Sequence, residues 1–306
     1  MTMEQIDMRV RLGGLELKNP VMPASGAYDY FECNANVFPM SRLGAVMVKS
    51  VHRNPRSGNP APRITEVLGG MINAVGIPSA GIEEFMSLRL PRYAQLETPV
   101  ILSLSGNTPE HYYESAEIVA NDARIGAIEL NLSCPNVGTG LPFSSDPQLL
   151  RQTVSEVRRR TTLPLFVKLS PNVTSICETA QIAEACGADA VTIANTYRAI
   201  KIDISTQKPV LGNISGGMSG PAIKPQTLFL VYQAYKTLHI PIIACGGITC
   251  WQDAVEYLLA GASALQVGCI NFVDPMAMAE IIDGLAHYMS CHGYRSLDEF
   301  RGNAQQ

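Results

Sequence analysis

Polar side chains stand at the ends of several short apolar segments of this sequence. Lys49, Asn131 and Lys168 each end such a segment, and Asn195-Thr196 follow another. Glu129 precedes Asn131 by two residues, so both side chains share one face of an extended strand. If the segments are parallel strands, these groups meet at one rim and form a pocket with two cations and several amides. Such a pocket suits a planar, anionic, amide-rich ligand better than a sugar or a metal ion, and we expect no metal site.

Cys134 is the candidate for reactive chemistry. It lies in the loop Asn131-Leu132-Ser133-Cys134-Pro135-Asn136, directly after an apolar segment. A thiol at a catalytic rim can act as a nucleophile or as a general base, whereas most cysteines are simply small buried side chains. None of the five histidines lies near it in the sequence, so a Cys–His hydrolase is without support.

Glycines follow the last two apolar segments, at Gly246-Gly247 and at Gly268. In α/β barrels the loops after the seventh and eighth strands often bind phosphate through backbone N–H groups. Another glycine cluster, at 215–220, could supply more donors or form a flexible lid. These positions predict a phosphate-binding corner.

Eight apolar segments alternate with amphipathic ones. The apolar segments are 20–24, 45–49, 99–103, 127–131, 164–168, 189–194, 241–245 and 263–267. The helical stretches include 108–123, 147–160, 173–186, 224–238, 251–260 and 275–291, with Asp146 and Thr174 as expected N-caps and Pro109 as an expected first residue. Proline opens every odd-numbered apolar segment and Gly-Ala precedes every even-numbered one, as strand starts and helix ends require. The pattern predicts an α/β fold, a (β/α)₈ TIM barrel. The alternative, an open doubly wound sheet, would need a Gly-x-Gly-x-x-Gly turn after its first strand, and the sequence has none there.

Extra length follows the second and sixth apolar segments, at 50–80 and 195–222, and 132–146 has a similar loop composition. All three stretches leave the carboxyl ends of predicted strands, where barrel active sites are built. We therefore expect one domain over 1–306 with long loops at the C-terminal face.

Composition excludes several classes of protein. The 306 residues carry 23 Lys+Arg and 27 Asp+Glu, a net charge of −4, which gives no support for a nucleic-acid or anionic-membrane partner. The eight cysteines contain no Cys-x-x-Cys pair, and the first eleven residues have no apolar run. We expect reduced cysteines, no signal peptide, no membrane segment and a cytoplasmic protein.

The motifs together resemble the dihydroorotate dehydrogenases of class 1, above all the B-type catalytic subunit. The residues that carry this resemblance are Lys49-Ser50, Gly58-Asn59-Pro60, Pro62-Arg63, Asn73-Ala74-Val75-Gly76, Asn131 to Val137, Val167 to Asn172, Asn195-Thr196, Lys208 to Leu211, Gly217 to Pro225 and Gly246-Gly247-Ile248. The resemblance spans nearly the whole chain. It implies an FMN-binding barrel that oxidises (S)-dihydroorotate to orotate in de novo pyrimidine biosynthesis.

The resemblance also assigns roles. Cys134 would remove the C5 proton, and the hydride would pass from C6 to FMN. The substrate-binding residues would be Lys49, Asn73, Ala74, Val75, Gly76, Ile77, Asn131, Asn195 and Thr196. The cofactor-binding residues would be Ser25, Lys49, Ser50, Ser103, Asn131, Lys168, Ala194, Gly220, Gly246, Gly247, Gly268 and Cys269. The chain departs from the family pattern at 77–80, Ser103, Ala194 and Cys269.

B-type enzymes pass electrons to NAD⁺ through a separate subunit with FAD and a [2Fe–2S] cluster. This chain has neither four-cysteine cluster spacing nor a dinucleotide fingerprint, so that chemistry would sit on a partner. The implied assembly is a homodimer flanked by two such subunits, a heterotetramer. Two alternatives stay open: a dihydropyrimidine dehydrogenase module for uracil-type rings, and a non-catalytic flavin-binding barrel.

Overall fold

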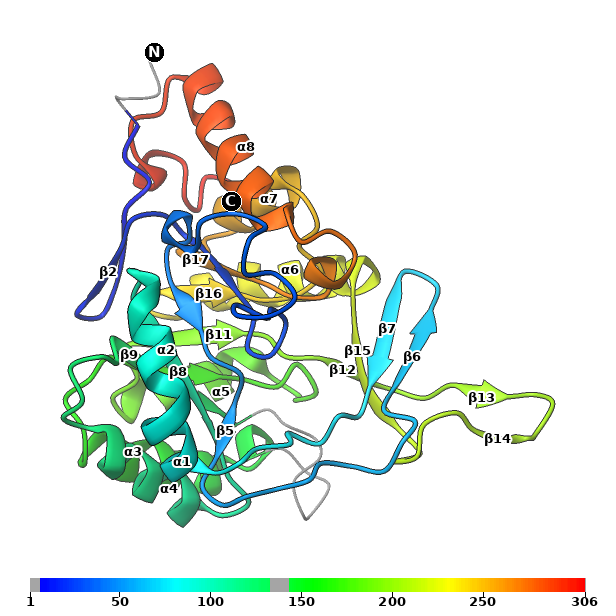
Figure 1. Cartoon of the computed structure of the whole chain (residues 1–306). Coiled ribbons are helices and arrows are strands. Elements are labelled where there is room, and N and C mark those ends of the chain that lie inside the picture. Colours follow the sequence, from blue (N-terminus) through cyan, green and yellow to red (C-terminus); the bar gives the residue numbers. More distant parts are fainter. Residues whose placement is uncertain (1–5, 133–142, 306) are drawn as a thin grey trace.

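The computed structural model describes residues 6–132 and 143–305, and its centre is a ring of eight parallel strands (Figure 1). The strands are β3 (Val21–Pro23), β4 (Val46–Met47), β8 (Val100–Ser105), β9 (Ala127–Asn131), β10 (Leu165–Lys168), β11 (Ala190–Ile193), β16 (Ile242–Ala244) and β17 (Ala264–Val267). Hydrogen-bonded neighbours follow the order β4-β8-β9-β10-β11-β16-β17-β3. Each strand lies at a segment predicted from the sequence, so the predicted (β/α)₈ barrel is confirmed.

The ring closes between β3 and β4 by a few specific contacts and not by a strand ladder. The backbone N–H of Gly44 donates to the carbonyl of Val21 at 2.9 Å, and Asn19 Nδ2 donates to the carbonyl of Arg42 at 2.7 Å. A Cβ atom at position 44 would lie 2.1 Å from the carbonyl oxygen of Asn19. Only glycine therefore allows the two segments to approach closely enough to close the barrel.

Six long helices cover the outside of the barrel. They are α3 (Pro109–Val119), α4 (Pro147–Arg158), α5 (Ile176–Ala185), α6 (Lys224–Tyr235), α7 (Trp251–Leu259) and α8 (Ala277–His292). Pro109 begins its helix and Asp146 caps α4, as predicted. The predicted cap Thr174 is wrong, because the Ser175 hydroxyl accepts the N–H of Glu178 at 3.2 Å. Glu178 stands three residues after Ser175, the spacing of a capping box.

The remaining connections are shorter or irregular. Between β3 and β4 the only helical turn is the 3₁₀ helix Met40–Arg42. Before β8, α1 (Ile82–Glu84) and α2 (Leu90–Tyr93) flank a π-helical turn, Phe85–Arg89. A hairpin of β1 (Val10–Leu12) and β2 (Leu15–Leu17) precedes the first barrel strand. The barrel is therefore regular in its strands and irregular in its first two connections.

The two long insertions form a second sheet, which corrects the expectation of loops at 50–80 and 195–222. The insertions supply β5 (Val51–His52), which extends the barrel beside β8, and then β6 (Ile64–Val67), β7 (Gly70–Asn73), β12 (Tyr197–Ala199) and β15 (Gly216–Ser219). These last four pair antiparallel in the order β12-β15-β7-β6. A hairpin of β13 (Ile202–Asp203) and β14 (Lys208–Pro209) projects from this sheet as an arm (Figure 1).

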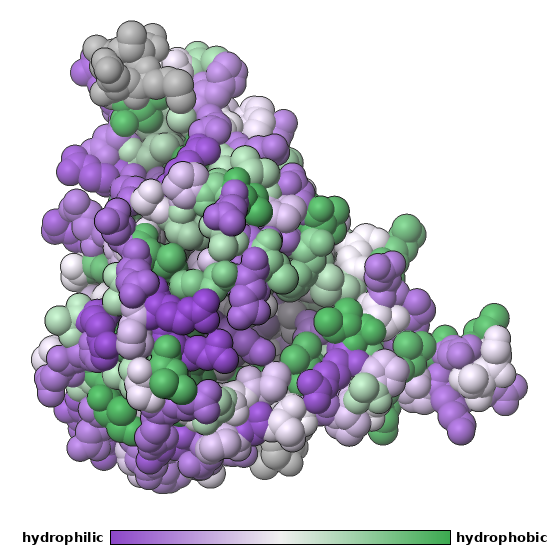
Figure 2. Space-filling view, viewed as in Figure 1, coloured by the Kyte–Doolittle hydropathy of each residue, from purple (hydrophilic) through white to green (hydrophobic). Residues whose placement is uncertain are grey.

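Apolar side chains are exposed on this sheet and its arm. Leu68 is 99% exposed and Ile204 is 87% exposed, and Ile64, Ile200 and Ile202 are exposed as well. Figure 2 shows green apolar patches on the arm and at its base. Clustered exposed apolar residues are typical of protein–protein contact surfaces.

Two further properties bear on function. Among residues 6–132 and 143–305, none of the helices has the length and hydrophobicity needed to span a bilayer. The seven cysteines that lie within these ranges are all free thiols.

Replacing Gly44 by alanine tests the closure of the ring. The new Cβ atom would overlap the carbonyl of Asn19, so we expect a loss of about 1–3 kcal/mol in the free energy of unfolding. The matched control is Gly14→Ala, whose Cβ would meet only Pro164 Cγ at 3.7 Å. Urea unfolding of both variants measures the difference, and equal midpoints would show that the seam does not require glycine.

Candidate active site

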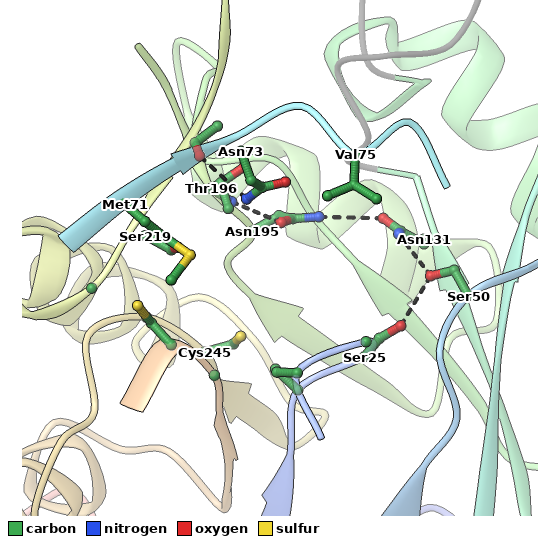
Figure 3. A pocket seen from close by; sticks show the side chains of 18 of the residues that line it. Ser25, Ser50, Met71, Asn73, Val75, Asn131, Asn195, Thr196, Ser219 and Cys245 are labelled. Atoms are coloured by element: carbon green, nitrogen blue, oxygen red, sulfur yellow. Dashed lines mark hydrogen bonds between the residues drawn. The ribbon is translucent and has the colours of Figure 1, made fainter. Parts of the chain in front are cut away.

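A cavity of about 280 Å³ opens at the carboxyl ends of the barrel strands, between the strands and the antiparallel sheet (Figure 3). Most of the residues predicted from the sequence line it. These are Ser25, Lys49, Ser50, Asn73, Val75, Gly76, Ile77, Asn131, Lys168, Ala194, Asn195, Thr196, Gly220, Gly246, Gly247, Gly268 and Cys269. The structure therefore brings together residues that are up to 244 positions apart in the chain, from Ser25 to Cys269.

Two described residues that were predicted for the site, Ala74 and Ser103, do not line this cavity. Ala74 is fully buried and packs with Ile72 and Leu211 on the opposite face of its segment. Ser103 is fully buried beneath Ser50, to which it is hydrogen-bonded. Cys134 lies outside the described residues.

A hydrogen-bonded chain of small polar side chains runs along one side of the cavity (Figure 3). Ser50 Oγ lies 3.0 Å from Ser25 Oγ and 2.9 Å from Ser103 Oγ. Asn131 Nδ2 donates to Ser50 Oγ at 3.0 Å, and Asn195 Nδ2 lies 3.4 Å from Asn131 Oδ1. These contacts fix the amide planes of both asparagines before any ligand binds, which reduces the entropy lost on binding.

The segment 73–77 presents alternate side chains to the cavity because its backbone is held from outside. Asn59 donates its backbone N–H to the carbonyl of Val75 and its Nδ2 to that of Ala74, both at 3.1 Å. Arg56 Nε donates to the carbonyl of Gly76 at 2.7 Å. Asn73, Val75 and Ile77 line the cavity, whereas Ala74 points away from it.

Ile77 adopts a backbone conformation that is rare for its side chain. Its φ angle is +50°, in the left-handed region that β-branched residues almost never occupy. Such strain persists only where surrounding contacts determine the conformation, and it is concentrated at functional sites. Here the hydrogen bonds from Arg56 and Asn59 to the backbone of 74–76 hold this conformation in place.

The described wall of the cavity is electropositive. It contains Lys49 and Lys168, and none of its described residues is acidic. The pKa of Lys49 lies below the usual lysine value, because the wall partly desolvates its ammonium and Arg63 repels it. Burial alone would also lower the pKa of Lys168, but Cys245 and Glu129 outweigh burial and raise it. The ammonium of Lys168 therefore holds its proton more firmly than that of Lys49.

Backbone donors form one corner of the cavity. The N–H groups of Gly246, Gly247 and Gly268 have no hydrogen-bond acceptor within the described chain. Unbonded N–H groups that converge on a cavity form a typical phosphate site. These donors, together with Lys168 on the same wall, fit the phosphate and the ring of the FMN that the sequence resemblance implies.

Several wall residues were not assigned to the site from the sequence. They are Ala24, Gly26, Ala27, Ile64, Met71, Gly217, Ser219, Ile223, Cys245 and Phe272. Met71 lies in β7 and Ser219 lies in β15. The glycine-rich sequences of these strands do not predict a strand. Cys245 could have been found, because it ends a predicted strand directly before Gly246. Within the described residues, no cluster of His, Cys, Asp or Glu could hold a metal ion.

Comparison with known proteins agrees with this geometry. A family profile described as "Dihydroorotate dehydrogenase" matches residues 7–289. A protein of Pelobacter propionicus is 44% identical over 297 residues, which cover 97% of this chain and 98% of that protein. A protein of Parabacteroides distasonis is 46% identical, with 97% of each chain covered. One of Bacillus pumilus is 42% identical over 97% of this chain and 96% of its own length.

All three relatives carry the name "Dihydroorotate dehydrogenase B (NAD(+)), catalytic subunit". The similarity extends over almost the full length of both partners in each comparison. The resemblance to B-type catalytic subunits, first seen in the sequence motifs, is thereby confirmed. The chain belongs to the dihydroorotate dehydrogenase family.

Proposed function

We propose that this chain oxidises (S)-dihydroorotate to orotate in pyrimidine biosynthesis, as one FMN-binding barrel domain. One observation carries the proposal. The cavity at the carboxyl ends of the strands combines two lysines, three asparagines and unbonded glycine N–H groups, with no acidic residue in its described wall. FMN, when bound, would supply the acceptor for the hydride, which carries both electrons.

Cys134 is the proposed base for the C5 proton. In the sequence it follows the cavity residue Asn131 by three positions. The described wall contains no carboxylate, imidazole or phenol that could take this role. A free thiol has a pKa near 8.5. The thiol must therefore give up its own proton before or while it accepts the C5 proton.

Recognition of the substrate ring is assigned to Asn73, Asn131, Asn195 and Thr196. Dihydroorotate offers amide donors and acceptors on its ring edges, and fixed carboxamides pair with them. The Thr196 backbone N–H donates to Asn195 Oδ1 at 2.8 Å, so this side chain is already oriented. A site of this kind rejects ring analogues that cannot pair, because its own polar groups would be left without partners. Lys49 supplies the cation for the substrate carboxylate.

Lys168 and the glycine corner are assigned to the cofactor. Lys168 places a buried positive charge where the reduced ring becomes negative, which stabilises that charge. Gly220, Gly246, Gly247, Gly268 and Cys269 would hold the phosphate end. Ser25, Ser50 and Ala194 would contact the ring, and Ser103 would support Ser50 through their hydrogen bond.

Electrons leave this chain through a partner in our proposal. The relatives are named as NAD(+)-linked catalytic subunits, and this chain lacks a dinucleotide fingerprint. We propose a partner subunit that carries FAD and a [2Fe–2S] cluster, a homodimer of this chain, and a heterotetramer in the cytoplasm. The exposed side chains of Leu68, Ile202 and Ile204 support such contacts, because they are apolar and have no cover within the described chain.

Anaerobic reduction is the direct test of the activity. Dihydroorotate added to the yellow protein should bleach the absorbance of bound FMN. Dihydrouracil, which lacks the carboxylate, should bleach it much more slowly. Faster bleaching by dihydrouracil would select the dihydropyrimidine alternative, and a colourless protein that does not take up FMN would contradict the proposal.

Cys134→Ser tests the base. A hydroxyl is a far weaker base at neutral pH, so flavin reduction by dihydroorotate should slow by about 10²–10⁴-fold, the usual contribution of acid–base catalysis. Stopped-flow absorbance measures the rate, and FMN titration should give unchanged affinity. A near-normal reduction rate would remove Cys134 from this role.

Lys49 should make orotate binding depend on pH. Its ammonium attracts the carboxylate, and its lowered pKa means that the charge is lost at a lower pH than in an ordinary lysine. Orotate affinity should therefore fall as the pH rises from 7 to about 10, and Lys49→Gln should weaken binding about tenfold or more at pH 7. Flavin difference spectra measure both proteins. Titration of orotate itself affects both equally, so identical pH slopes would contradict the prediction.

A further inference from the structure

One side-chain layer inside the barrel is polar where such layers are usually apolar. Barrel interiors are filled by layers of side chains from alternate strands, mostly Val, Ile and Leu. Here β9, β11 and β17 contribute Glu129, Thr192 and Gln266, and all three are fully buried. Burying a carboxylate is costly unless it is hydrogen-bonded and paired with a charge. A layer of this composition therefore needs both a bonding partner and a cation.

The layer is bonded into a relay that crosses the barrel. Glu129 Oε2 accepts from Thr192 Oγ1 at 2.8 Å and from Gln266 Nε2 at 2.5 Å. Gln266 Oε1 in turn accepts from Lys168 Nζ at 2.6 Å. Strands β9 and β17 are four places apart in the ring of eight, so Gln266 reaches Glu129 from the opposite wall.

The orientation of the Gln266 carboxamide is fixed by its neighbours. An ionised carboxylate only accepts hydrogen bonds and an ammonium only donates them. If the amide were turned over, its NH₂ group would face the ammonium of Lys168 and its oxygen would face Glu129. Both contacts would then be unfavourable, so the amide directs its oxygen to Lys168 and its NH₂ group to Glu129.

Lys168 has one donor left for a ligand. Its ammonium donates to Gln266 Oε1 and to Cys245 Sγ, the latter at 3.4 Å. Its third N–H has no acceptor within the described chain, and Lys168 lines the cavity. Burial raises the pKa of the Cys245 thiol above its usual value. Glu129 is the carboxyl group bonded into the relay, and its Oε1 has no hydrogen-bond partner of its own within the described residues.

We propose that Gln266 is a positioning residue, which links Glu129 to Lys168 and holds the Lys168 ammonium charged and directed at the ring of FMN. The proposal rests on the proposed binding of FMN, and it adds the residue that keeps the Lys168 ammonium charged. Neither Glu129 nor Gln266 is among the residues that line the cavity. Their effect on the flavin passes through Lys168.

If the polar layer has only a structural role, the expected results are different. Buried charged networks can often be replaced by apolar side chains of similar volume without loss of stability. If the layer only filled space, Gln266→Met would leave Lys168 and the flavin unchanged. If the relay acts as proposed, the same change would free the ammonium from its best acceptor and make its charge less stable.

The test uses Gln266→Met, which keeps volume, and Glu129→Gln, which keeps shape but removes the charge. The first readout needs no cofactor. In protein labelled with ¹³C-lysine, the Lys168 resonance, assigned by its loss in Lys168→Met, should titrate at lower pH in both variants. The second readout is the midpoint potential of bound FMN, measured against reference dyes. Reduced FMN should be destabilised about tenfold relative to oxidised FMN, which lowers the two-electron potential by about 30 mV.

Double variants separate the relay from general damage. In a Lys168→Met background, Gln266→Met should no longer change the potential, because its effect passes through the missing ammonium. The matched control is Thr153→Val, which removes a buried hydroxyl bonded to the Leu149 carbonyl, far from the cavity. This control should leave the potential and the Lys168 titration unchanged.

Each result decides the proposal. A lower Lys168 pKa, a lower potential and the absence of any further effect in the Lys168→Met background would support it. An unchanged Lys168 titration in both variants, or an equal loss of potential without Lys168, would overturn it. If the wild-type chain failed to hold FMN, the proposed function would fall, while the cofactor-free titration would still decide whether the relay exists.

Discussion

The closed ring of eight parallel strands is the constraint on which the site depends. The strands curve round to enclose a narrow interior, so each strand directs alternate side chains into it. The carboxyl ends of all strands also meet at a single rim. These two consequences place Asn131 and Lys168 at the mouth of the cavity, and they place Glu129 and Gln266 one layer below. The closure itself depends on a small contact, the approach of Gly44 to Asn19.

The mouth of the cavity depends on a second, independent construction. The antiparallel sheet joins β7 to β15, so that Asn73 is paired with Gly217, 144 residues later in the chain. Its glycines allow very close packing: a Cβ at Gly70 would lie 2.0 Å from the carbonyl of Ser219. This sheet carries the segment 73–77 and holds it over the strand ends. The barrel therefore supplies the floor of the site, and the insertions supply its roof.

Sequence patterns predicted the barrel and most of the wall, for identifiable reasons. Proline and Gly-Ala punctuation marks each strand start, and strand alternation places the rim residues. The second sheet could not be predicted. The sequences around Gly70 and Gly216-Gly217 show no apolar alternation, and the two strands that pair there are remote from each other in the sequence. The family resemblance assigns Ala74 to the substrate-binding residues, whereas its side chain is buried outside the cavity because an extended backbone turns every second side chain away. The Gln266 relay was missed because a single glutamine in an apolar segment gives no sign of its partners across a barrel.

The serine chain along the cavity has only two possible arrangements of its hydroxyl protons. Ser50 Oγ accepts a hydrogen bond from Asn131 Nδ2 and has a single proton of its own, which it can donate to either Ser25 or Ser103. If Ser25 donates to Ser50, then Ser50 must donate to Ser103; if Ser25 donates elsewhere, both remaining bonds reverse. A ligand atom that accepts from Ser25 therefore selects one direction of the chain, whereas a ligand atom that donates to Ser25 leaves the Ser25 proton available for the other. The hydrogen-bonding character of a bound group at the rim, donor or acceptor, is in this way transmitted to the fully buried hydroxyl of Ser103.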